Sequence, residues 1–449
     1  MLVTPGSDHN TVKGDVGWPL GGPTGKVPSD FLDMHGYAVL FSAVKGDGFT
    51  DALTADVVAY YLAFARAFGP VMLQEFGTLV THGAAQQETF LRTLLWQAWQ
   101  QGANGFLYWC MRDIKEHTAV PYNTHGLETM LGLFDADDNL KPGLAYFAQF
   151  ASDIQAAARV PAPPANGTGT AVYIPWYYYS RDDPGNPGNT PADLSPRLAM
   201  SFHLLLRADN SARNTTLHMV RGTHNGTRLS ATPATLVVPA MQLVEAEVAT
   251  LRALVAQGAT LAVYGYNPAA ISPALASLLG VQLPSEAGGS PAQAAIEVAF
   301  QGQHWTLSHI PGGKAANVSA AANATVTLRS SDGLAVGVWH RVGNGKVISV
   351  LADVASSALD VMGEPEKRRR WQLWFDQEAL RKLGAAGTGG QKGVAPAGLR
   401  SRAAAAVAAQ AGLRGRAAAF VGKRAAIYTQ DACVGKGVTV EVCHAGRRG

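Results

Sequence analysis

This sequence has few cysteines, no long apolar run and no pattern of a signal peptide. Its 449 residues include three cysteines, so no disulfide framework is expected, although Cys433 and Cys443 could pair. No run of about 18 apolar residues is present, so no membrane-spanning helix is expected. Residues 1–26 lack the basic-then-apolar layout of a signal peptide. Five Asn-x-Ser/Thr acceptors between Asn166 and Asn323 nevertheless leave a secreted or luminal location open.

Charge is distributed unevenly along the chain. The net charge is +3, yet residues 384–449 hold ten Lys and Arg residues against only Asp431 and Glu441, so the remainder is net negative. This tail is rich in Ala, Gly and Arg, and we expect it to be disordered. It offers only Phe420 and Tyr428 for stacking on bases, so nucleic-acid binding is not expected.

Strand-like and helical patterns alternate three times in residues 31–158, after an irregular Gly- and Pro-rich segment at residues 1–30. The expected strands are residues 37–44, 70–76 and 104–109, and the expected helices are residues 51–68, 84–101 and 142–158. Strands that alternate with helices indicate βα units and a parallel sheet, so the fold class is predicted to be α/β.

A proline-rich linker at residues 159–168 precedes a second α/β region, residues 169–290. Its short β-rich runs and intervening helix are typical of a flavodoxin-like, doubly wound domain. Residues 291–383 form a β-rich region that closes with a charged helix. Within it, the Gly-Asn-Gly run at 343–345 predicts a hairpin turn.

Three sites near strand ends carry the functional prediction. Glu75 ends an apolar run and is followed by Phe and Gly, which places a carboxylate where (β/α)8 barrels do their chemistry. Trp109 ends the next strand, and His35 and Tyr37 stand where the preceding strand-like segment opens. Taken singly, each residue has an ordinary structural explanation. Glu75 would be a strand-end carboxylate paired with a surface arginine, His35 a structural histidine and Trp109 a core residue.

Together these residues resemble the retaining β-glycosidases of glycoside hydrolase family 5, the cellulase and mannanase type, over residues 30–157. The matching pieces are His35-x-Tyr37, the strand that ends at Glu75, the run 105–109 with Asp113 after it, and the closing segment 131–142 with its Lys-Pro end. The resemblance implies the last three βα units of a (β/α)8 barrel.

The resemblance also implies roles for four residues. Glu75 would be the nucleophile, Tyr37 its hydrogen-bond partner, His35 a sugar ligand and Trp109 the stacking platform. Such chemistry uses paired carboxyl groups and needs neither a cofactor nor a metal ion.

One part of the family pattern is missing. The acid/base glutamate of the family lies in an Asn-Glu pair after the fourth strand, and this sequence contains no Asn-Glu dipeptide. Asp113, Glu116 and Glu128 are the available substitutes, although each is more ordinary as a solvated loop carboxylate. Without an acid, a glycosidase loses the factor of about 10²–10⁴ that proton donation supplies.

The second region resembles the glutamine-amidotransferase-like domain that follows the barrel in some β-galactosidases. No cysteine lies between Cys110 and Cys433, so the thiol nucleophile of amidotransferases is absent. The whole chain is therefore predicted to be a glycoside hydrolase that cleaves a β-linked poly- or oligosaccharide with retention. The alternative is a non-catalytic carbohydrate-binding or scaffold remnant. Only three βα units precede the linker, so we expect either that the N-terminal half of the barrel is missing from this sequence or that another polypeptide completes the barrel; a homo-oligomer is a further expectation.

Overall fold

The computed structural model describes residues 30–37, 52–78, 83–114, 129–157, 169–176, 198–203, 205–206, 217–222, 229, 233–239, 243–264, 272–282, 295–300, 303–308, 319–329 and 335–350. The chain divides into two compact units, Met1–Leu383 and Gly384–Gly449, and all described residues belong to the first. No helix among them is long and apolar enough to cross a membrane. The predicted α/β class is confirmed by this structure.

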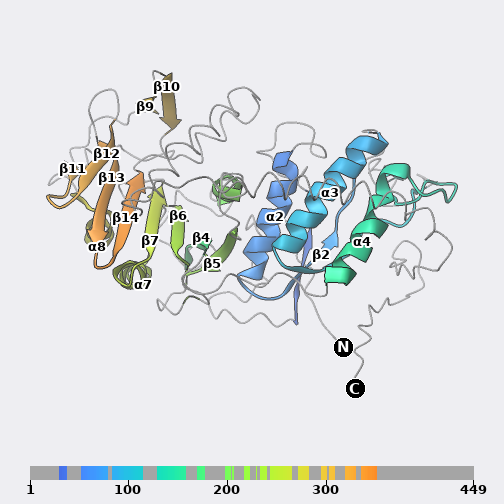
Figure 1. Ribbon diagram of the computed structural model, residues 1–449, viewed down its shortest axis with the longest axis horizontal. Helices are drawn as coiled ribbons and strands as arrows, with labels where there is room; N and C mark the ends of the chain where they lie inside the picture. Colours follow the sequence, from blue (N-terminus) through green and yellow to red (C-terminus); the bar gives the residue numbers. More distant parts are fainter. Residues whose placement is uncertain are drawn as a thin grey trace, which may run out of the picture. The chain divides into compact units, whose positions relative to one another are not determined.

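The first part of the chain forms a parallel sheet of three strands in the order β1-β2-β3. Figure 1 labels its middle strand, β2, beside the helices α2, α3 and α4. Its elements are β1 (Leu32–His35), α2 (Ala52–Arg66), β2 (Val71–Glu75), α3 (Ala84–Gln100), β3 (Ala103–Phe106), the 3-10 turn η6 (Pro142–Leu144) and α4 (Tyr146–Ala157). Helix α3 contacts both α2 and α4. The helix layer and the strands therefore follow the expected βα order.

The first strand lies earlier than the sequence pattern predicts. Residues 37–44 were the more apolar run, but the strand is Leu32–His35, and residues 38–44 lie outside the described part. The first three residues of β1 pair with residues 71–73 of β2, and the side chains of Leu32, Asp33 and Met34 are all buried. As a result His35 ends the strand rather than preceding it.

Helix α2 is buried on every side. Each residue from Ala55 to Ala65 is less than a tenth exposed, including Tyr60, Tyr61 and Phe64. A helix that is apolar all round belongs in the interior of a protein. α2 indeed contacts β1 and β2 on the one hand and β5 of the second sheet on the other.

A seven-stranded sheet in the order β12-β13-β14-β7-β6-β4-β5 forms the second half of the structure. Its elements are β4 (Thr170–Ile174), β5 (Leu217–Arg221), β6 (Thr235–Pro239), α7 (Glu245–Ala256), β7 (Thr260–Tyr264), α8 (Pro273–Leu279), β12 (Thr325–Arg329), β13 (Ala335–Val342) and β14 (Gly345–Val350). Two smaller ribbons pair β8 (Val281–Gln282) with β11 (Ser319–Ala320) and β9 (Ala295–Phe300) with β10 (Gln303–Ser308).

The β-rich residues 325–350 do not stand apart from the second region, because β14 pairs in parallel with β7 and extends the same sheet. The predicted turn at 343–345 joins the antiparallel strands β13 and β14. Which strand receives β14 depends on long-range pairing, and the local alternation of residues does not encode it.

The central strands of this sheet are buried on both faces, as parallel strands require. In β4, Val172 and Ile174 enter the core that contains α2, whereas Ala171 and Tyr173 enter the core beneath α7 and α8. β6 and β7 alternate in the same way. One core therefore runs continuously from the three-stranded sheet to one face of the seven-stranded sheet.

The fully buried Glu247 ties α7 to the carboxyl end of β4. Its Oε1 accepts hydrogen bonds from the Tyr173 hydroxyl at 2.7 Å and from the Trp176 amide at 2.8 Å. Its Oε2 accepts one from the Val244 amide at 3.1 Å. Gly222 leaves the necessary room, because a Cβ there would meet the same carboxylate and phenol.

Replacing Glu247 by alanine should lower the free energy of unfolding by about 3 kcal/mol, because two buried donors and the part-buried Val244 amide lose their acceptor. Urea denaturation followed by circular dichroism measures the change. Glu245→Gln, an exposed change in the same helical turn, is the control and should leave the unfolding midpoint unchanged. Equal effects of the two substitutions would contradict this role for Glu247.

Candidate functional site

A shift of register between β1 and β2 brings His35 and Glu75 together. Met34 pairs with Leu73, but the next residue, His35, pairs with Glu75 and skips Gln74. Paired residues of neighbouring strands point to the same face, and a one-residue shift moves a side chain to the opposite face. Glu75 therefore leaves the face of buried Leu73 and joins that of His35, with His35 Nδ1 at 3.4 Å from Glu75 Oε2.

The backbone on either side of this pair is closely packed. The Gly36 amide donates to the Glu75 carbonyl, and a Cβ on Gly36 would lie only 2.8 Å from a Leu73 methyl group. Both His35 and Glu75 keep about a quarter of their side-chain surface exposed, 26% and 24%, so a solute can reach them. Tyr37 is half-buried two residues beyond His35. Its hydrogen bond to Glu75 stays a prediction.

Trp109 is held directly beside the end of β2. Its amide donates to the Phe76 carbonyl at 2.9 Å, and a Cβ on Gly77 would lie 2.8 Å from the Trp109 carbonyl oxygen. Glycine at position 77 therefore permits a backbone approach that no other residue allows. The Trp109–Cys110 peptide bond is cis. His35 and Glu75 thus end β1 and β2, and Trp109 lies three residues after β3, the third strand of the same sheet.

Tyr108 also packs against the residues that follow β2. Its hydroxyl accepts a hydrogen bond from the Thr78 amide at 3.2 Å, and its ring meets Phe76 edge-on at 5.3 Å between centroids. Burial raises the pKa of Tyr108, so its phenol stays protonated at neutral pH. The sequence pattern had marked only Trp109 in this run. Its neighbour Tyr108 links the segments after β2 and β3.

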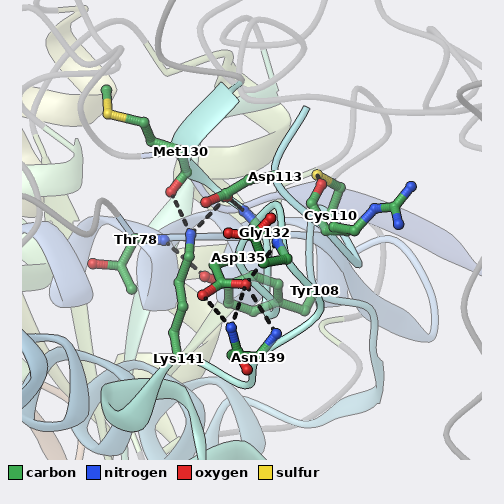
Figure 2. Close-up of polar contacts among 11 residues, drawn as sticks. Thr78, Tyr108, Cys110, Asp113, Met130, Gly132, Asp135, Asn139 and Lys141 are labelled. Atoms are coloured by element: carbon green, nitrogen blue, oxygen red, sulfur yellow. Dashed lines mark hydrogen bonds and ion pairs between the residues drawn. The ribbon is translucent and has the colours of Figure 1, made fainter. Parts of the chain in front are cut away.

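Asp113 belongs to a compact polar network rather than to the exposed loop surface (Figure 2). Its Oδ1 accepts from Lys141 Nζ at 2.6 Å and from the Gly132 amide at 2.8 Å. Lys141, only 5% exposed, also donates to the Met130 carbonyl at 2.9 Å. Asp113 is thereby committed to a structural ion pair. Glu116 and Glu128, the other substitutes for the acid, lie outside the described residues.

A tight turn follows this network and leads into α4. The Asp135 carboxylate accepts bonds from Asp137 N and from both the backbone and the side chain of Asn139, and the Asn139 bonds lower the pKa of that carboxyl. Asp138 takes a positive φ of 67° in the turn. The turn sets the direction in which Lys141 re-enters the structure.

No group of three or more His, Cys, Asp or Glu side chains that would suit a metal ion occurs in the part of the chain that is described.

Comparisons with known proteins bear on this site. No protein-family profile matches the chain, and no curated protein sequence matches it. The solved exo-beta-1,4-mannosidase Op5Man5 from Opitutaceae bacterium strain TAV5 is similar with 32% identity and a TM-score of 0.72. That match covers 83% of this chain and 65% of the mannosidase.

The chain has a glycoside-hydrolase fold of the TIM-barrel type. A catalytic mutant of Gan42B, a GH42 beta-galactosidase from G. stearothermophilus, aligns at 14% identity with a TM-score of 0.52, covering 78% of this chain and 49% of that one. The beta-galactosidase from Rahnella sp. R3 aligns at 14% identity and a TM-score of 0.51, over 75% and 51%. The predicted resemblance to glycoside hydrolases is thus confirmed, and the chain spans about half to two thirds of these proteins.

Gly77→Ala should destabilise the protein by about 1–3 kcal/mol, because the added Cβ forces the Trp109 backbone away from the end of β2. Urea denaturation measures this loss. Gly69→Ala is the matched control, since nothing lies within 4 Å of a Cβ at that position. It should leave stability equal or slightly raised. A Gly77→Ala protein as stable as the control would show that the close approach is not required.

Proposed function

We propose that this chain carries the nucleophile side of a retaining β-glycosidase site, with Glu75 as the nucleophile. The observation that supports this most is the His35–Glu75 pair, 3.4 Å apart at the carboxyl ends of adjacent parallel strands. In barrel enzymes this edge of the sheet holds the catalytic groups. Trp109, three residues beyond the end of β3, would add an aromatic face on which a sugar ring can stack.

The proposal treats β1, β2 and β3 as the last three strands of a (β/α)8 barrel. Their parallel order and the covering helices α2, α3 and α4 support this assignment. The seven-stranded sheet would be the flavodoxin-like, amidotransferase-like domain, whose inner strands are parallel and covered on one face by α7 and α8. The proline-rich residues 159–168 would link the two.

In the proposed reaction, a Glu75 oxygen attacks the anomeric carbon and the bond to the leaving oxygen breaks. Water then cleaves the glycosyl ester and restores the carboxylate. An Nδ1–H of His35 directed at Oε2 would orient the carboxylate, and its Nε2 would accept a hydrogen bond from a sugar hydroxyl. Tyr37 would donate its phenol hydrogen to the same carboxylate.

The proton donor for the leaving group is assigned to another part of the barrel. Asp113 does not serve, because Lys141 and the Gly132 amide occupy the oxygen that faces them. The sequence also has no Asn-Glu pair. We therefore propose that the acid lies on barrel strands supplied by further polypeptide, either in the same protein or in a partner.

A β-1,4-linked mannoside is the substrate that we propose. The support is the 32% identity with a protein whose name is exo-beta-1,4-mannosidase. The fold-level likeness to β-galactosidases carries no weight for the choice of sugar, because identity there is only 14%.

Covalent labelling tests the nucleophile. An activated 2-deoxy-2-fluoro-β-mannosyl reagent has a leaving group that needs no protonation, so it should form an ester on Glu75 even where the acid is absent. Intact mass and peptide mapping locate the label. Glu75→Gln should remove it, while Glu88→Gln, a carboxylate on the exposed face of α3, should not. A label elsewhere, or none on a folded protein, would overturn the assignment.

A second candidate is carbohydrate binding without turnover, favoured by the commitment of Asp113 to Lys141. In calorimetric titration with β-1,4-mannotriose, the folded protein should then give a saturable signal while the fluoro reagent leaves no label. Trp109→Ala should weaken that binding about tenfold, as truncation of a central aromatic contact commonly does. Saturable binding that persists unchanged in Trp109→Ala would contradict a role for this platform.

A further inference from the structure

The Lys141–Asp113 pair stands out as a buried charge pair on two segments that the proposed chemistry does not use. Lys141 is 5% exposed and the Asp113 side chain is 14% exposed. Buried ions of this kind are costly unless each finds partners. Here the ammonium has two partners, Asp113 and the Met130 carbonyl, and the shared carboxylate oxygen also receives the Gly132 amide. Such a network fixes both segments with respect to each other.

The network closes a short ladder that starts directly after Trp109. Leu133 N donates to the Cys110 carbonyl and Phe134 N to the Met111 carbonyl, both at 2.9 Å, while Asp113 N donates to the Phe134 carbonyl at 3.0 Å. Cys110, Met111 and Asp113 are therefore bonded through their backbones to Leu133 and Phe134. Lys141 and Asp113 lie at the far end of this ladder, as Figure 2 shows for their side chains.

The network requires glycine at position 132, because any side chain there would clash with the neighbouring backbone. A Cβ there would lie 2.3 Å from the Asp113 nitrogen and 2.6 Å from the Phe134 carbonyl oxygen. Next to it, a methyl of Leu131 lies 3.3 Å from the place where a Cβ on Gly77 would stand. The closing segment thus packs against the end of β2 as well as against the residues that follow Trp109.

Trp109 is consequently fixed on both sides. Its own amide bonds to Phe76, and the residue that follows it bonds to Leu133 in the ladder. We propose that Lys141 and Asp113 are positioning residues that hold the Trp109 ring in place for sugar binding at the strand-end site. This inference rests on the proposed function, because it needs Trp109 to contact the sugar. Glu75 is held separately, by strand pairing with His35 and by the Gly36 amide.

The consequence is a separation between binding and nucleophilic reactivity. Lys141→Met should weaken binding of β-1,4-mannotriose about tenfold, as loss of the platform itself does. The rate of Glu75 labelling at saturating fluoro reagent should stay within about twofold of the wild-type rate, because the contacts that hold Glu75 remain. A general loss of folding would instead lower both quantities together.

A double-mutant cycle decides whether Lys141 acts through Trp109. Trp109→Ala and Lys141→Met, alone and combined, are titrated with mannotriose in the full chain. The combined variant should bind no more weakly than Trp109→Ala alone. Effects that multiply, so that the double variant binds about 100-fold more weakly than wild type, would overturn the proposal. Unchanged binding in Lys141→Met would also overturn it.

Arg112→Gln is the matched control, because it breaks an ion pair between the same two segments. Arg112 and Asp138 lie 3.2 Å apart but are 57% and 71% exposed, so their pairing contributes little. The control should bind mannotriose as the wild type does. A tenfold loss of binding in Arg112→Gln would show that breaking an exposed ion pair between the two segments has the same effect as breaking the buried one, which contradicts the proposal.

A second variant covers the case in which Lys141→Met does not fold, as judged by circular dichroism. Asp113→Asn keeps an acceptor for the Gly132 amide but removes the charge facing Lys141, and it should give the same non-additive result with Trp109→Ala. Wild-type protein that neither binds mannotriose nor takes up the label would overturn the proposed function itself. Normal wild-type behaviour with an additive cycle would overturn only this inference.

Discussion

The close approach of two backbones, at Gly77 and Trp109, governs the geometry of the strand-end site. A Cβ at position 77 would stand 2.8 Å from the Trp109 carbonyl oxygen, and the Phe76 carbonyl bonds to the Trp109 amide. Glu75 precedes this contact by two residues. The separation between the main chains that carry Glu75 and Trp109 is thus set by backbone contacts. A rigid framework of this kind is what a positioned nucleophile requires.

Part of the site was predictable from the sequence, because its signals are local. Glu75 ends β2, as its apolar run indicated, whereas β3 ends at Phe106 and Trp109 follows it by three residues instead of ending the strand. The register shift at Gln74 was not predictable, since it depends on how two strands 40 residues apart pair. His35 was misplaced at the start of a strand for the same reason: the apolar run after Gly36 outweighed the shorter buried strand before it.

The division of the fold also shows where local signals end. Helices α2 and α3 begin and end within two residues of their expected bounds, because the periodic spacing of apolar residues in a helix is a local property of the sequence. The burial of α2 against both sheets is a different matter. Asp56 in α2 bonds at 2.6 Å to His203 and to Gln97, and these partners lie 147 and 41 residues away. A proline-rich linker suggested separation, yet the apolar residues on its two sides share one core.

The ladder that Lys141 and Asp113 close also bears on which changes in chain length the protein can tolerate during evolution. Residues 110–113 on one side and residues 130–134 on the other are held by hydrogen bonds. The two ends of the stretch between them are therefore fixed in position. Closure entropy grows only slowly with the length of a loop whose ends are already joined. A change in the number of residues between these two anchors should therefore cost little stability, while the contacts that hold the Trp109 backbone stay in place.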